Sequence, residues 1–172
     1  MPVKTGSRMP DFRYQDRVAG DFVTIILREQ SNKSRVVLFG LPGAFTPTCS
    51  TQQLPKYEEL YDDFIEAGVD GVFCTSVNDP FVMNAWFDSL DIKKVKSVPD
   101  GNGDLAQSLG MFVAKRNLNF GHRSWRYAMV IDMENKIIEK VFAEEGYADD
   151  MESDPYELSN PENVLEWLKN QS

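Results

Sequence analysis

The segment VVLFGLPGAFTPTC (residues 36–49) joins three features that decide the fold. Val36–Leu41 is a short run with apolar residues on both faces, which predicts a fully buried strand. The next residues, Pro42–Thr48, contain two prolines and two threonines and lead directly to Cys49. After Cys49, apolar residues recur at helical spacing with acidic residues between them. The segment therefore predicts a strand, a loop, and a helix that carries a cysteine in its first turn.

Strands and helices continue to alternate along the rest of the chain. Pro55 falls inside the first helix and should kink it, because proline removes a backbone donor and clashes with the preceding turn. The expected strands are Phe22–Leu27, Val69–Val77, Val95–Val98 and a hairpin of Tyr127–Met133 with Lys136–Ala143. The expected further helices are Phe81–Phe87, Leu105–Met111 and Pro161–Lys169. Residues 30–34 are expected to form a loop. This order predicts an α/β sandwich with a mixed central sheet flanked by helices, in a single domain of residues 1–172.

Composition restricts the classes of partner. The formal net charge is −9, and residues 139–157 hold eight acids but only one base, Lys140. This charge would repel phosphate groups, so neither a nucleic acid nor a membrane is expected as a partner. The chain has no apolar segment of bilayer length and no apolar signal core at its start, so we expect a cytoplasmic protein. With two cysteines and one histidine, we expect no disulfide framework, metal site or cofactor.

Cys49 is the first candidate for chemistry. In the first turn of a helix, free N–H groups and the positive end of the helix dipole stabilise a thiolate relative to the thiol. The alternative is that Cys49 is a small apolar residue packed against the strand, as most unpaired cysteines are. Thr46 favours the reactive thiol, because its hydroxyl can hydrogen-bond the sulfur or an incoming oxygen.

The spacing Pro42-x-x-x-Thr46-x-x-Cys49 resembles the peroxidatic-cysteine motif of peroxiredoxins. The strings LPGAFTPTCS (41–50), SVNDPFVMNAW (76–86) and NFGHRSWRYAMVI (119–131) are similar to the peroxiredoxin-5 (type II) subfamily, and in particular to the peroxiredoxin half of bacterial hybrid peroxiredoxin–glutaredoxin proteins. The resemblance extends over roughly residues 10–168. It implies a thioredoxin fold with peroxiredoxin insertions and a peroxidase that acts on hydrogen peroxide and alkyl hydroperoxides.

The resemblance also implies roles for individual residues. Cys49 would be the nucleophile that becomes a sulfenic acid, and Thr46 would hydrogen-bond the thiolate and the peroxide. Pro42 would shield the sulfur from water, and Arg126 would stabilise the thiolate and polarise the peroxide. Four further residues would contact the substrate: backbone N–H groups near Gly43 and Thr48, and an apolar mouth formed by Phe45 and Phe120, although either Phe could instead be a core residue.

Three other sets of residues are better explained by packing or solvation. Lys115 and Arg116 are expected in a solvated loop, and so is the acidic stretch Glu144–Asp154. Met83, Trp86 and Phe87 are at helical spacing and are expected to pack in the core, with some of them at a dimer interface, since the resemblance implies a homodimer.

Cys74 is the one other cysteine, and it lies within a predicted strand. A mid-strand cysteine is more often a small core residue, and a disulfide with Cys49 requires Cα atoms within about 7 Å of each other. Cys74 is therefore at most a possible resolving cysteine. We expect a one-cysteine cycle with an external thiol, and the resemblance implies glutathione with a glutaredoxin acting in trans, or thioredoxin.

Three functions fit these features. The first is a thiol peroxidase, the second is a thiol-based redox sensor or redox-regulated binding protein, and the third is a catalytically silent scaffold. The presence of Pro42, Thr46, Cys49 and Arg126 together favours the enzyme, because a sensor or a scaffold does not need all four.

Overall fold

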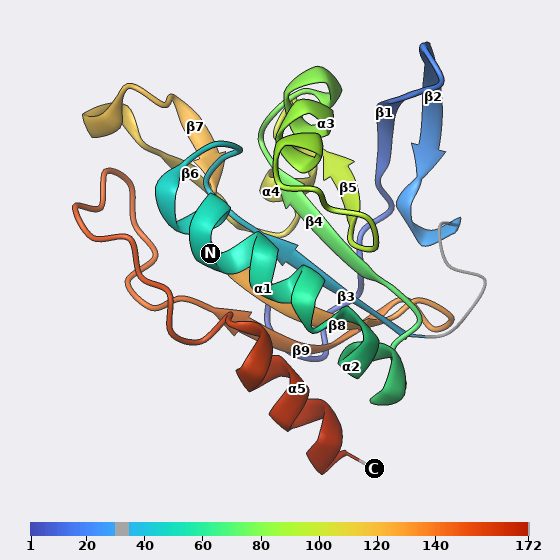
Figure 1. Ribbon diagram of the computed structural model, residues 1–172. Helices are drawn as coiled ribbons and strands as arrows, with labels where there is room; N and C mark the ends of the chain where they lie inside the picture. Colours follow the sequence, from blue (N-terminus) through green and yellow to red (C-terminus); the bar gives the residue numbers. More distant parts are fainter. Residues whose placement is uncertain (30–34, 172) are drawn as a thin grey trace.

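The computed structural model describes residues 1–29 and 35–171, and its centre is a five-stranded sheet in the order β5-β4-β3-β8-β9 (Figure 1). β3 (Arg35–Gly40), β4 (Val72–Ser76) and β5 (Lys96–Pro99) run parallel. β8 (Tyr127–Asp132) is antiparallel to β3 and to β9 (Ile137–Ala143). The predicted mixed sheet is therefore confirmed, while the loop predicted at residues 30–34 lies outside the described residues.

Helices cover one face of this sheet. Apolar side chains of α1 (Leu54–Glu59), α2 (Tyr61–Glu66), α3 (Pro80–Ser89) and α5 (Pro161–Asn170) share one core cluster with Val37 and Phe39 of β3. Figure 1 shows α1, α2 and α5 lying in front of the sheet. The short α4 (Asp104–Ser108) and the N-terminal segment contribute to a second cluster on the other face. Within the described ranges, no helix is long and apolar enough to cross a membrane.

Two helices begin with the same pair of signals. The side chain of Asp79 accepts a hydrogen bond from the Val82 N–H at the start of α3, and Asn160 accepts one from Asn163 at the start of α5. In each case the next residue is a proline, which has no N–H to satisfy at the first helical position. The predicted starts of both helices are confirmed within a residue.

The helix that follows Cys49 is less regular than its apolar spacing predicts. The chain is helical from Pro47, but Cys49–Gln53 (η2) is a π-helix and α-helical geometry begins only at Leu54. We expected Pro55 to kink a continuous helix, but it is the second residue of α1. The irregularity is instead the change from π-helical to α-helical geometry just before it. A further break at Leu60, with φ −93° and ψ 8°, separates α1 from α2.

Two small hairpins flank the central sheet. β1 (Arg13–Val18) pairs with β2 (Asp21–Ile26), and β6 (Phe112–Ala114) pairs with β7 (His122–Ser124). Only β2 was predicted, because β1 is largely polar and a strand of three residues is too short to show alternation. The loop between β6 and β7 contains a 3-10 turn, η3 (Arg116–Leu118), and a similar turn, η1 (Leu27–Glu29), follows β2.

Gly40 leads to a prediction about stability. It pairs with Tyr127 across β3 and β8, and a Cβ at Gly40 would lie 2.3 Å from Cε1 of that buried ring. We expect Gly40→Ala to lower the free energy of unfolding by about 1–3 kcal/mol, because the ring has no room to move. Urea unfolding measures this, and Gly71→Ala is the control, since its Cβ would make only an ordinary 3.4 Å contact with Phe73. Equal stability of the two variants would contradict the argument.

Candidate active site

The loop before Cys49 is held by hydrogen bonds at both of its ends. The Thr46 hydroxyl donates to the Gly43 carbonyl at 2.7 Å, and the Thr46 carbonyl accepts from the Ser50 N–H at 3.0 Å. The Ala44 N–H donates to the Asn78 side chain, which follows β4, at 3.0 Å. The loop is thereby fixed both to the helix that it begins and to the carboxyl end of the sheet.

Cys49 lies in the first turn of the helix, as predicted, and its side chain is fully buried. Its carbonyl accepts a hydrogen bond from the Leu54 N–H, five residues on, which is the π-helical pattern. The next residue, Ser50, accepts a hydrogen bond from the Trp86 indole N–H at 2.9 Å, so α3 contacts the helix beside the thiol. Thr48 makes no side-chain capping bond, which leaves its backbone N–H as its possible contribution.

Arg126 is 2% exposed, and its guanidinium has three neighbours (residues 53, 154 and 156). Nη1 donates to Oε1 of Gln53 at 2.9 Å, and Nη2 donates to Oδ1 of Asp154 at 2.6 Å. The ring of Tyr156 lies 5.6 Å from Cζ. Nε–H is buried and has no partner among the described residues. Since Gln53 is four residues from Cys49 on the same helical segment, Arg126 is fastened to the element that carries the thiol.

Arg123 is a site residue that we did not predict. Its Nη1 donates to the Pro42 carbonyl at 3.2 Å, and its guanidinium lies 5.1 Å from the centre of the Phe120 ring. A Cβ at Gly43 would lie 2.4 Å from Nη1, so only glycine leaves room for this contact. Burial lowers the pKa of Arg123, while the negative charge of Cys49 raises it. Two residues of the loop and two of the β6–β7 hairpin are thus in contact: Pro42, Gly43, Phe120 and Arg123. Pro42 and Arg123 are far apart in the chain, so the sequence could not predict this contact.

Lys115 is buried as well, so its predicted place in a solvated loop is wrong. Burial lowers the pKa of Lys115, whereas the charges of Asp154 and Cys49 raise it. Its ammonium group also lies 6.0 Å from the Trp125 ring. The charge of Asp154 therefore acts on two buried cations, on Arg126 through an ion pair and on Lys115 through its pKa. Arg116, by contrast, is exposed as expected.

The acidic stretch Glu144–Asp154 was also expected to be solvated, which is wrong for Glu144 and holds for the exposed Asp154. Glu144 is 3% exposed, and its carboxylate accepts hydrogen bonds from the backbone N–H groups of Glu157, Leu158 and Ser159. Asp154 forms the ion pair with Arg126. Acids of this stretch therefore accept hydrogen bonds from buried backbone N–H groups and from Arg126. The pattern of charges in the sequence does not predict these partners.

Cys74 lies in the same apolar cluster as Cys49. It is fully buried, opposite Phe39 in the sheet register. Burial raises the pKa of the Cys74 thiol well above its usual range, and the charge of Cys49 raises it further. Cys74 is therefore held as a neutral thiol. Met83, Trp86 and Phe87 are core residues, as predicted, and the exposed apolar residue of α3 is Phe81.

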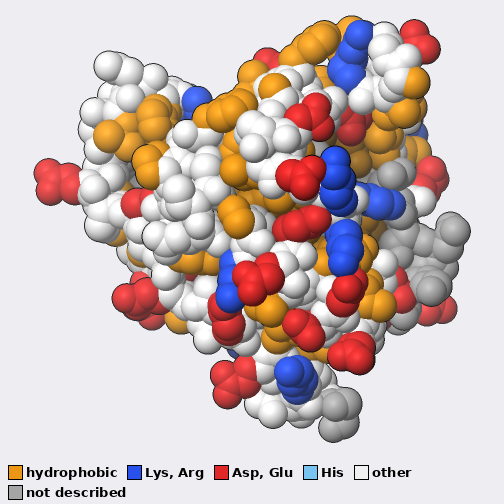
Figure 2. All heavy atoms as spheres, viewed as in Figure 1, with side chains coloured by type: hydrophobic (Ala, Val, Ile, Leu, Met, Phe, Trp, Pro, Cys, Tyr) orange, Lys and Arg blue, Asp and Glu red, His pale blue; other side chains and the backbone are white. Residues whose placement is uncertain are grey.

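The two aromatic residues predicted at the mouth of the site are both partly or largely accessible. Phe45 is 55% exposed and has φ +64°, a conformation that is strained for a bulky side chain. Phe120 is half-buried beneath Arg123. Figure 2 shows the surface hollowed between the β6–β7 hairpin and α3, above the loop that precedes Cys49.

Comparison with known proteins gives a consistent result. Residues 4–158 match the Redoxin family. The chain is 48% identical to a peroxiredoxin of Sinorhizobium fredii, covering 98% of this chain and 93% of that protein. The structure matches the 1-Cys peroxiredoxin antioxidant protein of Plasmodium falciparum with a TM-score of 0.91 and 40% identity, over 98% of this chain and 99% of the other. This chain belongs to the peroxiredoxin family.

The peroxiredoxin is of the Prx5 type. It is 39% identical to the hybrid peroxiredoxin hyPrx5 of Haemophilus influenzae over 95% of this chain and 65% of that protein. The mixed sheet flanked by helices is the thioredoxin fold of peroxiredoxins, as the resemblance implied. Family membership makes the protein a thiol peroxidase.

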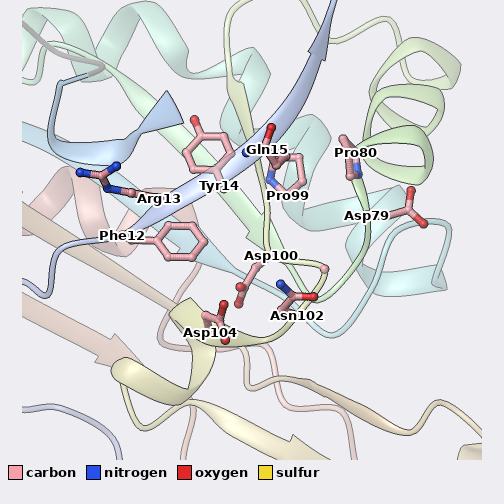
Figure 3. A pocket seen from close by; sticks show the side chains of 11 residues that line it. Phe12, Arg13, Tyr14, Gln15, Asp79, Pro80, Pro99, Asp100, Asn102 and Asp104 are labelled. Atoms are coloured by element: carbon pink, nitrogen blue, oxygen red, sulfur yellow. The ribbon is translucent and has the colours of Figure 1, made fainter. Parts of the chain in front are cut away.

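A cavity of about 230 Å³ lies elsewhere in this peroxiredoxin and does not serve the thiol (Figure 3). It is lined by residues of β1, the start of α3 and the loop after β5, among them Asp79, Asp100 and Asp104. The two carboxylate oxygens of Asp100 accept hydrogen bonds from the N–H groups of Leu105 and Ala106. Although burial raises the pKa of Asp100 to about 6, its oxygens are occupied in holding the start of α4. We therefore assign this acid a structural role.

Proposed function

We propose that this peroxiredoxin reduces hydrogen peroxide and small organic hydroperoxides at Cys49. The observation that carries the proposal is the state of Arg126, which is buried, anchored through Gln53 to the helix of Cys49, and has a free Nε–H. A buried N–H group without an acceptor destabilises the folded protein, so its presence calls for an explanation such as a catalytic role. A reacting oxygen on which negative charge develops would supply the missing acceptor.

The reaction starts from the Cys49 thiolate. Its sulfur attacks one oxygen of the peroxide, an S–O bond forms, and the O–O bond breaks. The electron pair of that bond leaves on the other oxygen, which takes up a proton and departs as water or an alcohol. Cys49 is thereby oxidised to the sulfenic acid while the peroxide is reduced. The guanidinium of Arg126 stabilises the charge on the departing oxygen without losing its own proton.

Thr46 has a more specific role than the sequence suggested. Because its hydroxyl proton is donated to the Gly43 carbonyl, its oxygen is left as an acceptor. We assign it to accept a hydrogen bond from the peroxide O–H, which would orient the peroxide for attack. Pro42, buried and bonded through its carbonyl to Arg123, would keep water from the sulfur, and the N–H groups of Gly43 and Thr48 would donate to the peroxide oxygens.

For reduction of the sulfenic acid we propose an external thiol. One thiol displaces water from the sulfenic acid and forms a mixed disulfide with Cys49, and a second thiol releases Cys49 and leaves as the oxidised disulfide. The neutral, buried Cys74 favours this route, because thiols attack as thiolates. We propose glutathione with a glutaredoxin as the reductant, in the cytoplasm, where thiols are kept reduced.

Stopped-flow oxidation by hydrogen peroxide tests the reaction, with Trp fluorescence as the signal, since the Trp86 indole is bonded beside Cys49. Cys49→Ser should abolish the fast phase, because burial raises the pKa of the other thiol, Cys74, and keeps it neutral. Cys74→Ser should keep the first oxidation and the turnover with glutathione and glutaredoxin within about twofold, as expected of a packing residue.

Two outcomes would overturn parts of this proposal. Consumption of peroxide by Cys49→Ser at the wild-type rate would exclude Cys49 as the nucleophile. Loss of turnover in Cys74→Ser, with the first oxidation unchanged, would make Cys74 the resolving cysteine and end the one-cysteine cycle.

We also propose that the protein is a homodimer. Phe22 and Phe81 are more than half exposed and meet edge to face, with the centres of their rings 5.8 Å apart. Arg17 lies over both rings, 4.6 Å and 5.1 Å from their centres. Exposed aromatic residues with an arginine are typical of protein interfaces.

Sedimentation velocity tests this interface. Phe81→Glu should convert the dimer to a monomer, because it removes the aromatic ring from the contact and replaces it with a carboxylate that loses hydration in the dimer. Ile65→Glu, on an exposed residue of α2, is the matched control and should leave the dimer intact. A wild-type protein that sediments as a monomer, or a Phe81→Glu variant that remains a dimer, would contradict this assignment.

A further inference from the structure

Asp154 belongs to a segment whose other acids fix its position. Residues 144–159 connect β9 to α5, and Glu144 binds three backbone N–H groups at the far end of this segment. In its middle, the Asp149 carboxylate accepts a hydrogen bond from the Ala114 N–H at 2.8 Å, and Asp150 accepts one from the Arg116 N–H at 2.7 Å. The segment is thus attached to the β6–β7 hairpin and to the start of α5, and Asp154 lies between these attachments.

The ion pair of Asp154 reaches from the surface to the buried site. The Asp154 side chain is 47% exposed, whereas the Arg126 side chain is 2% exposed, and Nη2 and Oδ1 are 2.6 Å apart. A guanidinium is planar and has five N–H groups in fixed directions. Two anchors at different nitrogens therefore set the orientation of the whole plane. Gln53 is bound to Nη1 and Asp154 to Nη2, so Nε is the nitrogen without a partner among the described residues, and its N–H points in a fixed direction.

We propose that Asp154 is a positioning residue, which holds the Arg126 guanidinium in the orientation needed for peroxide reduction at Cys49. The inference rests on the proposed function, since it assigns the source of the orientation that this function requires. Asp154 acts through Arg126 and does not itself contact the reacting atoms. Gln53 alone would constrain the plane less, because it holds only one of the three guanidinium nitrogens.

The sign of the effect separates positioning from a simple effect of charge. A carboxylate near a reacting anion raises the energy of that anion, so removal of the charge of Asp154 would by itself speed the reaction. Loss of the orientation of Arg126 would slow it, because small misplacements of a catalytic group cost large factors in rate. The two explanations therefore predict opposite changes for the same substitution.

The experiment measures the second-order rate constant for oxidation by hydrogen peroxide, in the full chain carrying Cys74→Ser so that only Cys49 reports. Asp154→Ala, which removes both the acceptor oxygen and the charge, should slow the oxidation by roughly 10- to 100-fold and move the midpoint of the pH–rate profile to higher pH. A rate that is unchanged or increased, or a midpoint that moves to lower pH, would overturn the proposal.

Asp150→Ala is the matched control. It removes an attachment of the same segment, to the N–H groups of Arg116 and Asn117, without touching Arg126. We expect its rate to stay within about threefold of the parent. If Asp150→Ala slows the oxidation as much as Asp154→Ala does, the order of the segment is what matters, and the specific role of Asp154 is wrong.

A double substitution identifies the partner through which Asp154 acts. In the Arg126→Gln background, Asp154→Ala should have no further effect on the rate beyond about twofold. The charge of Asp154 also raises the pKa of Lys115, so a further large loss in this background would assign the effect to Lys115 and overturn the proposal. If instead the parent protein itself does not react with peroxide, it is the proposed function that fails.

Discussion

A buried positive charge is the constraint on which the rest of the site depends. The Arg126 guanidinium is almost completely removed from water, and a charge in that position is stable only if its surroundings supply acceptors for its donors. Two acceptors come from distant parts of the chain, Gln53 on the helix of Cys49 and Asp154 on the segment before α5. Nε is the one guanidinium nitrogen without a partner among the described residues, and we assign its N–H to the substrate.

This constraint accounts for features that look irregular when considered alone. The π-helical segment that begins at Cys49 contains Gln53, so local helix geometry and the anchoring of Arg126 are linked. The acidic segment 144–159 follows the edge strand β9, and hydrogen bonds to the Glu144 carboxylate hold its two ends together. These bonds help to fix the segment from which Asp154 pairs with the buried guanidinium. On the other side of the loop, Gly43 has no side chain, and this leaves space for Arg123 beside Pro42.

The sequence predicts some of these features better than others, for physical reasons. The central sheet and the helices around it follow from apolar periodicity, and the position of Cys49 follows from a strand that leads into a loop and a helix start. Contacts between distant residues have no such periodic signal. The burial of Lys115 and of Glu144 was therefore not predicted, because charged residues in a row predict solvation unless their partners are known. Those of Glu144 are backbone N–H groups of residues 157–159. Hairpins of three-residue strands, such as β6–β7, are too short for any pattern.

The central claim is that peroxide reduction depends on the geometry of the Arg126 guanidinium and not only on its charge. The most direct test is the rate constant for oxidation of Cys49 by hydrogen peroxide in Arg126→Lys, which keeps the positive charge but loses the planar set of donors. The account predicts a loss of roughly 100-fold or more, comparable to removal of a donor that stabilises a developing anion. A rate within a few-fold of the wild type would contradict it, since charge alone would then be sufficient.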